Sequence, residues 1–293
     1  MIDLITVVFG RELSYLEIQA KSIDRYVNVT DINSIIIVVN DDKEVCKTID
    51  PTWYGDFKHK IKIIHYSELI LNYSTNGWDS QQVLKLLAAG KSTVNWSMVL
   101  DAKTWFVRPL DLNDIFNIDG KVHFALLEFS SHFQNEKHFV EELFHINFDN
   151  MIIGPFGVPF MFNSNVIKML ITDIENISTV NFADFFLTYV SNPPRLTEFI
   201  LYSGYILYKF KSYNAFYCDY AKYSAWNLAD WEVNNFDSKW LILFQDPTIL
   251  TASIHRRAYS ALSDSQKNMW ISFLFDKKLI DSTTNAKNKL NTV

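Results

Sequence analysis

The chain has 293 residues, of which 48% are hydrophobic and 15% aromatic, whereas glycine and proline number just 8 and 7. This composition is typical of a globular protein with a sizeable core and excludes a disordered or fibrous chain. The net charge is −6 and no block of basic residues occurs. The charge pattern excludes nucleic acid as the main partner, because binding phosphates along a strand requires clustered Lys and Arg.

The cysteines and the apolar pattern indicate a cytoplasmic protein. Cys46 and Cys218 show no metal-ligand spacing and are too few for a disulfide framework, which fits a reducing compartment. No apolar run reaches the roughly 18 residues that a membrane-spanning helix needs, and the N-terminal sequence enters a strand at once, unlike a signal peptide. We expect membrane contact, if any, to be peripheral, through exposed aromatic side chains at the inner face of the membrane.

Apolar runs of strand length alternate with helical patterns in the first half. The runs predict strands over residues 4–9, 34–39, 60–66, 97–100 and 123–129. Apolar residues recur at helical steps over 14–27 and 79–91, and Gly90 marks the end of the second helix. Continuous apolar strands alternating with helices predict an α/β fold, with a mostly parallel sheet and helices on both of its faces.

The second half is richer in helical patterns. A double proline at 193–194 precedes a helix that runs to residue 210, and Thr197 and Glu198 lie in its first turn. Ser263 and Gln266 form a capping box that begins a helix over 263–275. Because no internal repeat or linker occurs, we expect one domain over residues 1–275, with a C-terminal helical elaboration, followed by a polar tail over 276–293.

Polar residues follow three of the predicted strands directly. They form the triplets Gly10-Arg11-Glu12, Asn40-Asp41-Asp42 and Asp101-Ala102-Lys103. In open α/β sheets, ligands bind at the carboxyl ends of the parallel strands, so the three triplets favour a binding site there. The alternative is that they are ordinary solvated turns, because Asp and Asn are common turn residues.

The third triplet has a particular chemistry. A carboxylate at the end of a buried strand, with a second acid two residues later, holds a divalent cation against a diphosphate in many proteins. Here Lys103 stands at the place of the second acid. Either Lys103 meets the diphosphate itself and makes a metal dispensable, or Asp101 binds Mn²⁺ or Mg²⁺ together with a distant ligand such as His255. A third alternative is that Asp101 caps the turn and Lys103 is solvated.

Several segments together resemble a bacterial family of glycosyltransferases. The segments are "GWDSQQVLKLLAA", "LDAKTWFVRPLD", "GPFGVPFMF", "RLTEFILYSGYI" and "SIHRRAY". They are similar to nucleotide-sugar-dependent transferases of the GT-A fold that build capsules and lipopolysaccharides, over roughly residues 1–275. The resemblance implies a nucleotide-sugar donor and a glycan or lipid-linked glycan acceptor. It also places Asp101-Ala102-Lys103 where the family has its acidic metal motif, from which Lys103 departs.

The resemblance implies roles for the first two triplets and for one helix face. Phe9, Arg11, Asn40 and Asp41 would hold the base and ribose of the nucleotide, and they are otherwise turn residues. The predicted helix face that would line the donor pocket, with its lysine reaching phosphate, consists of Trp78, Gln81, Gln82 and Lys85. The alternative for these four is a solvated helix face.

Two further groups complete the expected site. Glu198 is the candidate general base, because a carboxylate in the first turn of a helix can face a cleft and take a proton from an acceptor hydroxyl; the helix dipole alone also favours an acid there. His255, Arg256 and Arg257 would stabilise a diphosphate leaving group, since Arg binds phosphate through two hydrogen bonds. Their alternative is a surface cluster at a helix start.

The leading expectation is therefore an inverting glycosyltransferase with Glu198 as base. A second hypothesis is a haloacid-dehalogenase-like phosphatase with Asp101 as nucleophile, although that motif has a second Asp where Lys103 stands and lies on the first strand. A third is a non-catalytic transferase-like domain that binds a glycan or a partner protein, which the altered acidic motif supports.

Overall fold

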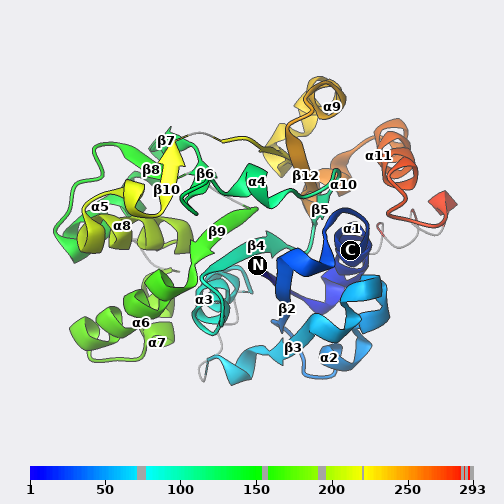
Figure 1. Ribbon diagram of the computed structural model, residues 1–293. Coiled ribbons are helices and arrows are strands. Elements are labelled where there is room, and N and C mark those ends of the chain that lie inside the picture. Colours follow the sequence, from blue (N-terminus) through cyan, green and yellow to red (C-terminus); the bar gives the residue numbers. More distant parts are fainter. Residues whose placement is uncertain are drawn as a thin grey trace.

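The computed structural model describes residues 1–70, 77–153, 158–190, 196–219, 221–284, 287 and 290. The glycine- and proline-containing segment 154–157 and the double proline at 193–194 lie outside the described residues. The α/β architecture predicted from the sequence is confirmed: a central sheet lies between helices, with further helices and small sheets around it (Figure 1).

The central sheet has five strands in the order β3-β2-β1-β4-β9. Neighbours among the first four are parallel, whereas β9 runs antiparallel to β4. The strands are β1 (Ile2–Val8), β2 (Ile32–Val39), β3 (Ile61–His65), β4 (Trp96–Asp101) and β9 (Phe160–Asn163). Every residue of β1 is buried, because helices cover both faces of the sheet. A sheet covered on both sides requires such continuous apolar runs.

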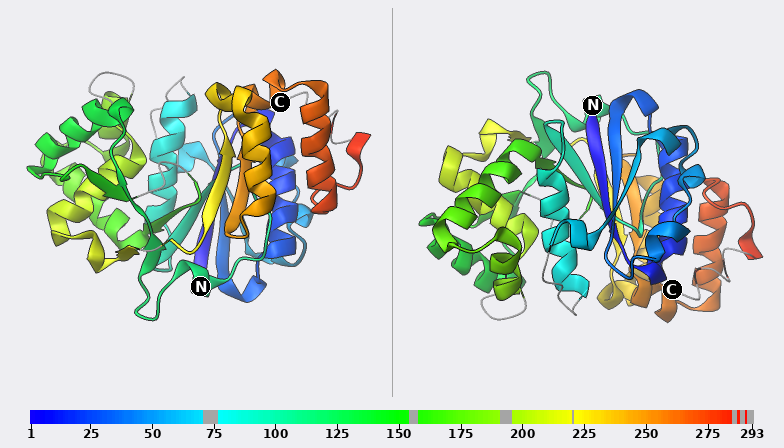
Figure 2. Two further views of the ribbon diagram at one scale, coloured as in Figure 1. Left: turned by 90° about the horizontal axis from the view of Figure 1, so that it is seen from above. Right: turned by 90° about the horizontal axis from the view of Figure 1, so that it is seen from below.

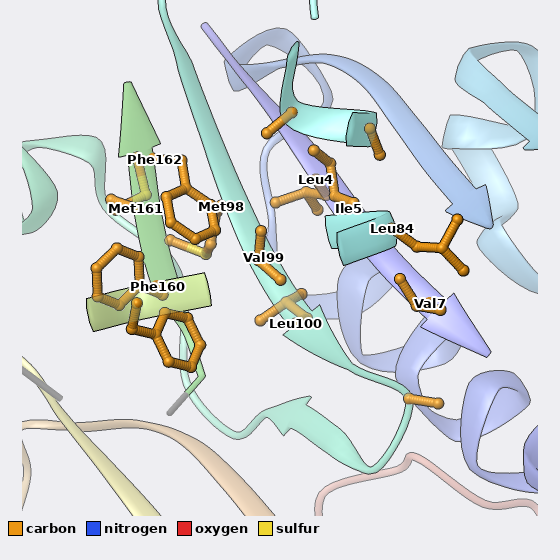
Figure 3. Close-up of a cluster of buried hydrophobic side chains, with 14 of the residues drawn as sticks. Leu4, Ile5, Val7, Leu84, Met98, Val99, Leu100, Phe160, Met161 and Phe162 are labelled. Atoms are coloured by element: carbon orange, nitrogen blue, oxygen red, sulfur yellow. The ribbon is translucent and has the colours of Figure 1, made fainter. Parts of the chain in front are cut away.

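Helices α1 (Leu13–Tyr26) and α3 (Gly77–Gly90) cover opposite sides of the parallel strands (Figure 2). Leu84 of α3 packs over the side chains of β1, and the core continues across β4 to the aromatic residues of β9 (Figure 3). On the other side, Thr6 of β1 donates a hydrogen bond to Gln19 of α1 at 2.8 Å. These contacts fix the two helices relative to the end of β4, where the site lies.

A second sheet continues directly from the first. Two residues separate β4 from β5 (Thr104–Phe106), which pairs antiparallel with β12 (Ile249–Ile254). β12 in turn pairs parallel with β11 (Ser224–Leu228). Trp105 attaches this sheet to α1, because its indole N–H donates to the carbonyl of Tyr15 at 3.1 Å. Trp105 also contacts Trp270 of α11 (Asp264–Asp276), with ring centroids 5.6 Å apart.

The remaining elements form the periphery of the molecule. Two small sheets pair β6 with β10 and β7 with β8. The helices α5 to α8 gather beyond β9, and α9 to α11 lie near β12 and α1 (Figure 1). The strands are β6 (Val122–Phe124), β7 (Leu126–Glu128), β8 (Met151–Ile153) and β10 (Tyr217–Asp219). The α-helices are α2 (Val45–Thr48), α4 (Leu112–Ile115), α5 (Gln134–Phe144), α6 (Ser164–Ser178), α7 (Phe182–Val190), α8 (Glu198–Phe210), α9 (Phe236–Gln245) and α10 (Arg256–Ala261). The 3₁₀ helices are η1 (Gly10–Glu12), η2 (Val29–Asp31), η3 (Pro51–Lys60), η4 (Tyr66–Glu68), η5 (Ser131–Phe133), η6 (Tyr213–Ala215) and η7 (Asp230–Asn235).

Most predicted elements are confirmed to within two residues, but the strand expected over 123–129 is wrong. The segment divides into β6, which is buried and pairs with β10, and β7, which is partly exposed and pairs with β8. One apolar run therefore forms two short strands, each of which pairs with a different strand. Within the residues that the structure describes, no helix has both the length and the apolar character needed to cross a membrane.

Candidate active site

A cavity of about 480 Å³ lies beside the carboxyl end of β4. Its walls come from α3, the β4–β5 turn, the first turn of α8, the strands β11 and β12, and η7. The residues expected on one face of α3 all line it, namely Trp78, Gln81, Gln82 and Lys85. Of the other predicted site residues, it is lined by Asp101, Lys103, Glu198 and His255. The structure thus brings together residues from both halves of the chain.

Four of these side chains form a row of alternating charge. Lys103 lies 2.8 Å from Oδ2 of Asp101, and Lys85 lies 3.0 Å from its Oδ1. The same Lys85 Nζ lies 3.1 Å from Oε1 of Glu198. The side chains of Lys85 and Glu198 are 7% and 5% exposed, against 22% for Lys103. The row therefore runs from a deeply buried carboxylate to an ammonium group that solvent in the cavity can reach.

The charges in this row support one another. Although burial opposes ionisation of Asp101, Lys103 and Lys85 hold the pKa of its carboxyl well below the usual range. Burial also disfavours the ammonium form of Lys85, but Asp101 and Glu198 raise its pKa above the usual value. Burial raises the pKa of Glu198, and the nearby Lys85 limits that rise. Lys85 consequently stays charged, and Glu198 is a stronger base than an exposed glutamate.

Gln19 positions the β4–β5 turn, and the sequence analysis missed it. Its side-chain amide donates to the carbonyl of Asp101 at 2.7 Å and to that of Thr104 at 3.0 Å, so both ends of the turn are held by one group. Gln19 is fully buried on the side of α1 that faces the sheets. The sequence did contain a signal for this role, namely a glutamine beside the apolar face of a helix. Such a glutamine is expected to be buried, and a buried amide requires hydrogen-bond partners.

Two cavity residues carry polar atoms that form no hydrogen bond with the described part of the chain. Neither the amide nitrogen nor the oxygen of Gln82 has a partner, although the residue is 3% exposed. Nδ1 of His255 is also buried without a partner. Leaving such groups unpaired costs free energy. Because a carboxamide needs both a donor and an acceptor, Gln82 is suited to a ligand hydroxyl, whereas an ionised phosphate offers acceptors alone.

The residues expected to hold the base and ribose do not line this cavity. Asn40 is buried and donates to Ser80 at 3.0 Å, and Asp41 accepts a hydrogen bond from the backbone of Gly10 at 2.8 Å. The guanidinium of Arg11 lies 5.3 Å from the ring centroid of Phe9. These contacts account for the four residues as parts of the turns that follow β1 and β2, and their nucleotide contacts stay a prediction.

Two arginines expected at the diphosphate also lie outside the cavity lining. His255 is the residue before α10 and borders the cavity, whereas Arg256 and Arg257 form the first turn of that helix. The side chain of Arg257 is 74% exposed and lies 3.8 Å from Asp230, a cavity residue on η7. The structure thus places His255 and Lys103 at one cavity, and the phosphate contacts of Arg256 and Arg257 stay a prediction.

The residues around Asp101 do not fit the expected Mn²⁺ or Mg²⁺. Such cations require several oxygen ligands, and among the described residues no three His, Cys, Asp or Glu side chains are grouped to hold a metal. Both carboxylate oxygens of Asp101 are already bound by ammonium groups, and Gln81 donates to Oδ1 at 3.3 Å. A cation placed there would face two positive charges. The expectation that Asp101 and His255 hold a metal is therefore not supported.

Comparisons with solved structures give weak similarities. The galactosyltransferase LgtC, solved with donor and acceptor sugar analogs, matches with 12% identity over 98% of this chain and 100% of LgtC, at a TM-score of 0.41. The glycosyltransferase GlyE of Streptococcus pneumoniae TIGR4 matches with 14% identity over 99% of this chain and 62% of GlyE, at a TM-score of 0.44. Mouse xyloside xylosyltransferase 1 matches with 10% identity over 86% of this chain and 98% of its own, at 0.44. Similarity at this level decides neither the activity nor the site residues.

Sequence comparison is more decisive about the family. Among curated proteins, none matches the chain significantly. The model of a family of unknown function, DUF6492, matches residues 8–241. The matched part is well over half of the chain and contains the whole row from Lys85 to Glu198, while His255 lies beyond it. The chain therefore belongs to the DUF6492 family.

Proposed function

We propose that this protein is a glycosyltransferase that moves a sugar from a nucleotide-activated donor to a glycan acceptor with inversion of configuration. One observation carries the proposal: a buried carboxylate, Glu198, and a more exposed cation, Lys103, line the same cavity. Ion pairs through Lys85 and Asp101 connect these two groups. A sugar transfer by direct displacement needs a base for the acceptor and a positive charge for the leaving diphosphate.

The position and the lining of the cavity suit a sugar nucleotide. Ligands of open α/β sheets bind at the carboxyl ends of the parallel strands, and β4 ends at the cavity. Lys103 can meet an anionic group, and the unpartnered amide of Gln82 can meet a hydroxyl. A ligand that carries phosphate and hydroxyl groups side by side satisfies both residues.

Aromatic side chains form part of the cavity lining. Trp78 on α3 and Trp231 on η7 both line it and are 49% and 83% exposed. Phe133, at the end of η5, also contributes to the lining. The flat apolar faces of these side chains suit the face of a sugar ring or a base.

In the proposed reaction, an acceptor hydroxyl oxygen attacks the anomeric carbon of the donor sugar. Glu198 accepts the hydroxyl proton, a bond forms between the acceptor oxygen and the anomeric carbon, and the bond from that carbon to the phosphate oxygen breaks. The electron pair leaves with the nucleoside diphosphate, whose charge Lys103 stabilises. Lys85 keeps Glu198 close to the ionised form that a base requires, and a single displacement inverts the anomeric carbon.

The same proposal includes a biological setting. We propose that the acceptor is a growing surface polysaccharide or a lipid-linked glycan of the capsule or lipopolysaccharide type in a bacterium, extended in the cytoplasm at the inner face of the membrane. The segments that resemble the GT-A family support this setting. The phosphatase hypothesis is disfavoured, because a nucleophilic Asp101 needs a free carboxylate oxygen and both of its oxygens are bound to lysines.

The test combines binding and transfer. Thermal unfolding is followed with UDP, GDP, ADP, CMP and their sugar conjugates, in EDTA and in Mn²⁺; we expect at least one to stabilise the protein. Glu198→Gln should lower sugar transfer at least 100-fold while the nucleotide Kd changes less than threefold.

Glu44→Gln, at an exposed glutamate paired with Lys47, is the matched control and should transfer sugar like the wild type. No stabilisation by any nucleotide would contradict the proposal and favour a non-catalytic binding domain. Hydrolysis of a simple phosphate ester that is lost in Asp101→Asn would favour the phosphatase instead.

A further inference from the structure

We infer that this site binds the diphosphate of its donor without a divalent cation, with Lys103 supplying the positive charge and Asp101 acting as a positioning residue for two lysines. The inference rests on the proposed function and deepens it. Its starting point is the disagreement between the acidic motif that the sequence resemblance places at Asp101 and the lysine-bound carboxylate that the structure shows.

The two lysines have different tasks. Lys85 is buried between Asp101 and Glu198 at 3.0 and 3.1 Å, and its ammonium also lies 5.6 Å from the ring centroid of Phe199. Two of its three donors are therefore committed to buried carboxylates within the protein. Lys103 reaches Asp101 alone among the described side chains, at 2.8 Å, and borders the cavity. An ammonium group has three donors, so Lys103 has donors left for a ligand.

The charge balance of the row, which leaves out the cavity residue Asp230, also favours an anionic ligand over a metal at Asp101. Lys85 and Lys103 balance Asp101 and Glu198, so the row is neutral before any ligand binds. A divalent cation at Asp101 must displace both ammonium groups from that carboxylate, which would leave Lys85 on Glu198 alone. A diphosphate oxygen can instead approach Lys103 from the cavity while every ion pair of the row stays intact.

The turn geometry holds Lys103 in place for this task. Ala102 is 2% exposed and Gln19 binds the carbonyls on both sides of the turn, so the backbone at Lys103 cannot shift freely. His255 directly follows the end of β12 and lines the same cavity, and its buried Nδ1 has no hydrogen-bond partner among the described residues. Lys103, on a held backbone, and His255 thus line one cavity and can provide donors for phosphate oxygens without a metal ligand set.

The test measures the binding of UDP, GDP, ADP and inorganic pyrophosphate by calorimetry with the full-length protein. At least one probe should bind in EDTA, and added Mn²⁺ or Mg²⁺ should leave its Kd within about twofold or weaken it. Lys103→Met should weaken binding in EDTA at least tenfold, and Lys103→Arg should restore most of the loss. Lys47→Met removes an exposed lysine of an ion pair and should change nothing.

The outcomes separate the inference from the proposed function. Binding at least tenfold tighter with Mn²⁺, and absent in EDTA, would overturn the inference while the glycosyltransferase proposal stands. Wild-type affinity in Lys103→Met would also overturn it. Absence of binding by every probe under both conditions would overturn both. A folded Lys103→Met variant is verified by its thermal unfolding, and Lys103→Arg serves as the independent measurement if that variant is unstable.

Discussion

Replacement of Lys85 by methionine leaves two buried carboxylates, Asp101 and Glu198, facing the space that the ammonium occupied. The wild-type distances from Nζ are 3.0 and 3.1 Å. At an effective dielectric constant of about 20, each pair has a gross attraction of about 5 kcal/mol, from which the cost of burying the charges must be subtracted. Breaking a buried ion pair by removing one partner costs about 3–5 kcal/mol, and this is the expected loss in the free energy of unfolding.

The assay is urea unfolding at 25 °C, in which the midpoint should fall with an unchanged slope. For a chain of 293 residues, the same loss lowers the unfolding temperature by about 5–8 °C. When Glu198→Gln is added to Lys85→Met, about 1–2 kcal/mol of the free energy of unfolding should be recovered, because one of the unpaired buried carboxylates is then neutral. Lys47→Met is the control: Lys47 and Glu44 are both 72% exposed, and the loss should stay below about 1 kcal/mol.

The pH dependence gives a second check on Lys85→Met. Burial already raises the pKa of Glu198 above its ordinary 4.5, and removing Lys85 raises it further. When a carboxyl has a higher pKa in the folded than in the unfolded state, the free energy of unfolding falls as the pH rises between the two pKa values. The loss of stability in Lys85→Met, relative to the wild type, should therefore be largest at neutral pH and should shrink towards pH 4.5. A variant as stable as the wild type, to within 1 kcal/mol, would refute a charged network at this position.

Three further predictions concern other parts of the molecule. The acidic limb of the transfer rate should lie above the ordinary glutamate pKa, since burial raises the pKa of Glu198; a limb near pH 4 in a kcat–pH profile would exclude Glu198 as the base. Gly204→Ala should lower stability by about 1–3 kcal/mol, because the added carbon would lie 2.2 Å from Val140; urea unfolding measures this, and a loss under 0.5 kcal/mol would contradict the close packing of α8 on α5. Trp231→Ala should leave the unfolding temperature unchanged, because Trp231 is 83% exposed, and should weaken acceptor binding several-fold; an unaffected KM for the acceptor would exclude a stacking role.

The sequence predicted the central sheet well, because its signals are local. Strands buried on both faces must be continuously apolar, and helices that cover them must repeat every three or four residues. The resemblance to the GT-A family implied the face of α3 with Trp78, Gln81, Gln82 and Lys85, and all four residues line the cavity. Glu198 was placed in the first turn of its helix, and Thr197 caps that helix through the backbone N–H of Ile200.

The sequence could not predict what depends on contacts between distant segments. Lys85 meets Glu198 across 113 positions, and Gln19 meets the carbonyl of Asp101 across 82. The strand β5 has just three residues and pairs with β12, which lies far from it in the sequence. A segment this short has no periodic pattern from which a strand could be predicted. Lys85 therefore resembled either a solvated or a ligand-binding lysine, when it in fact links two acids. The domain limits at 275 and 276 stay a prediction.

The order of the four charges along the chain bears on how the protein assembles. Residues up to 106 contain β1 to β5 together with α1 and α3, and they supply Lys85, Asp101 and Lys103 but not their fourth partner. This N-terminal part carries one unbalanced positive charge in its row until α8 docks and Glu198 reaches Lys85. Docking of α8 thus completes both this wall of the cavity and the neutrality of the row. Glu198, the proposed base, consequently also joins α8 to the N-terminal part of the chain through an ion pair.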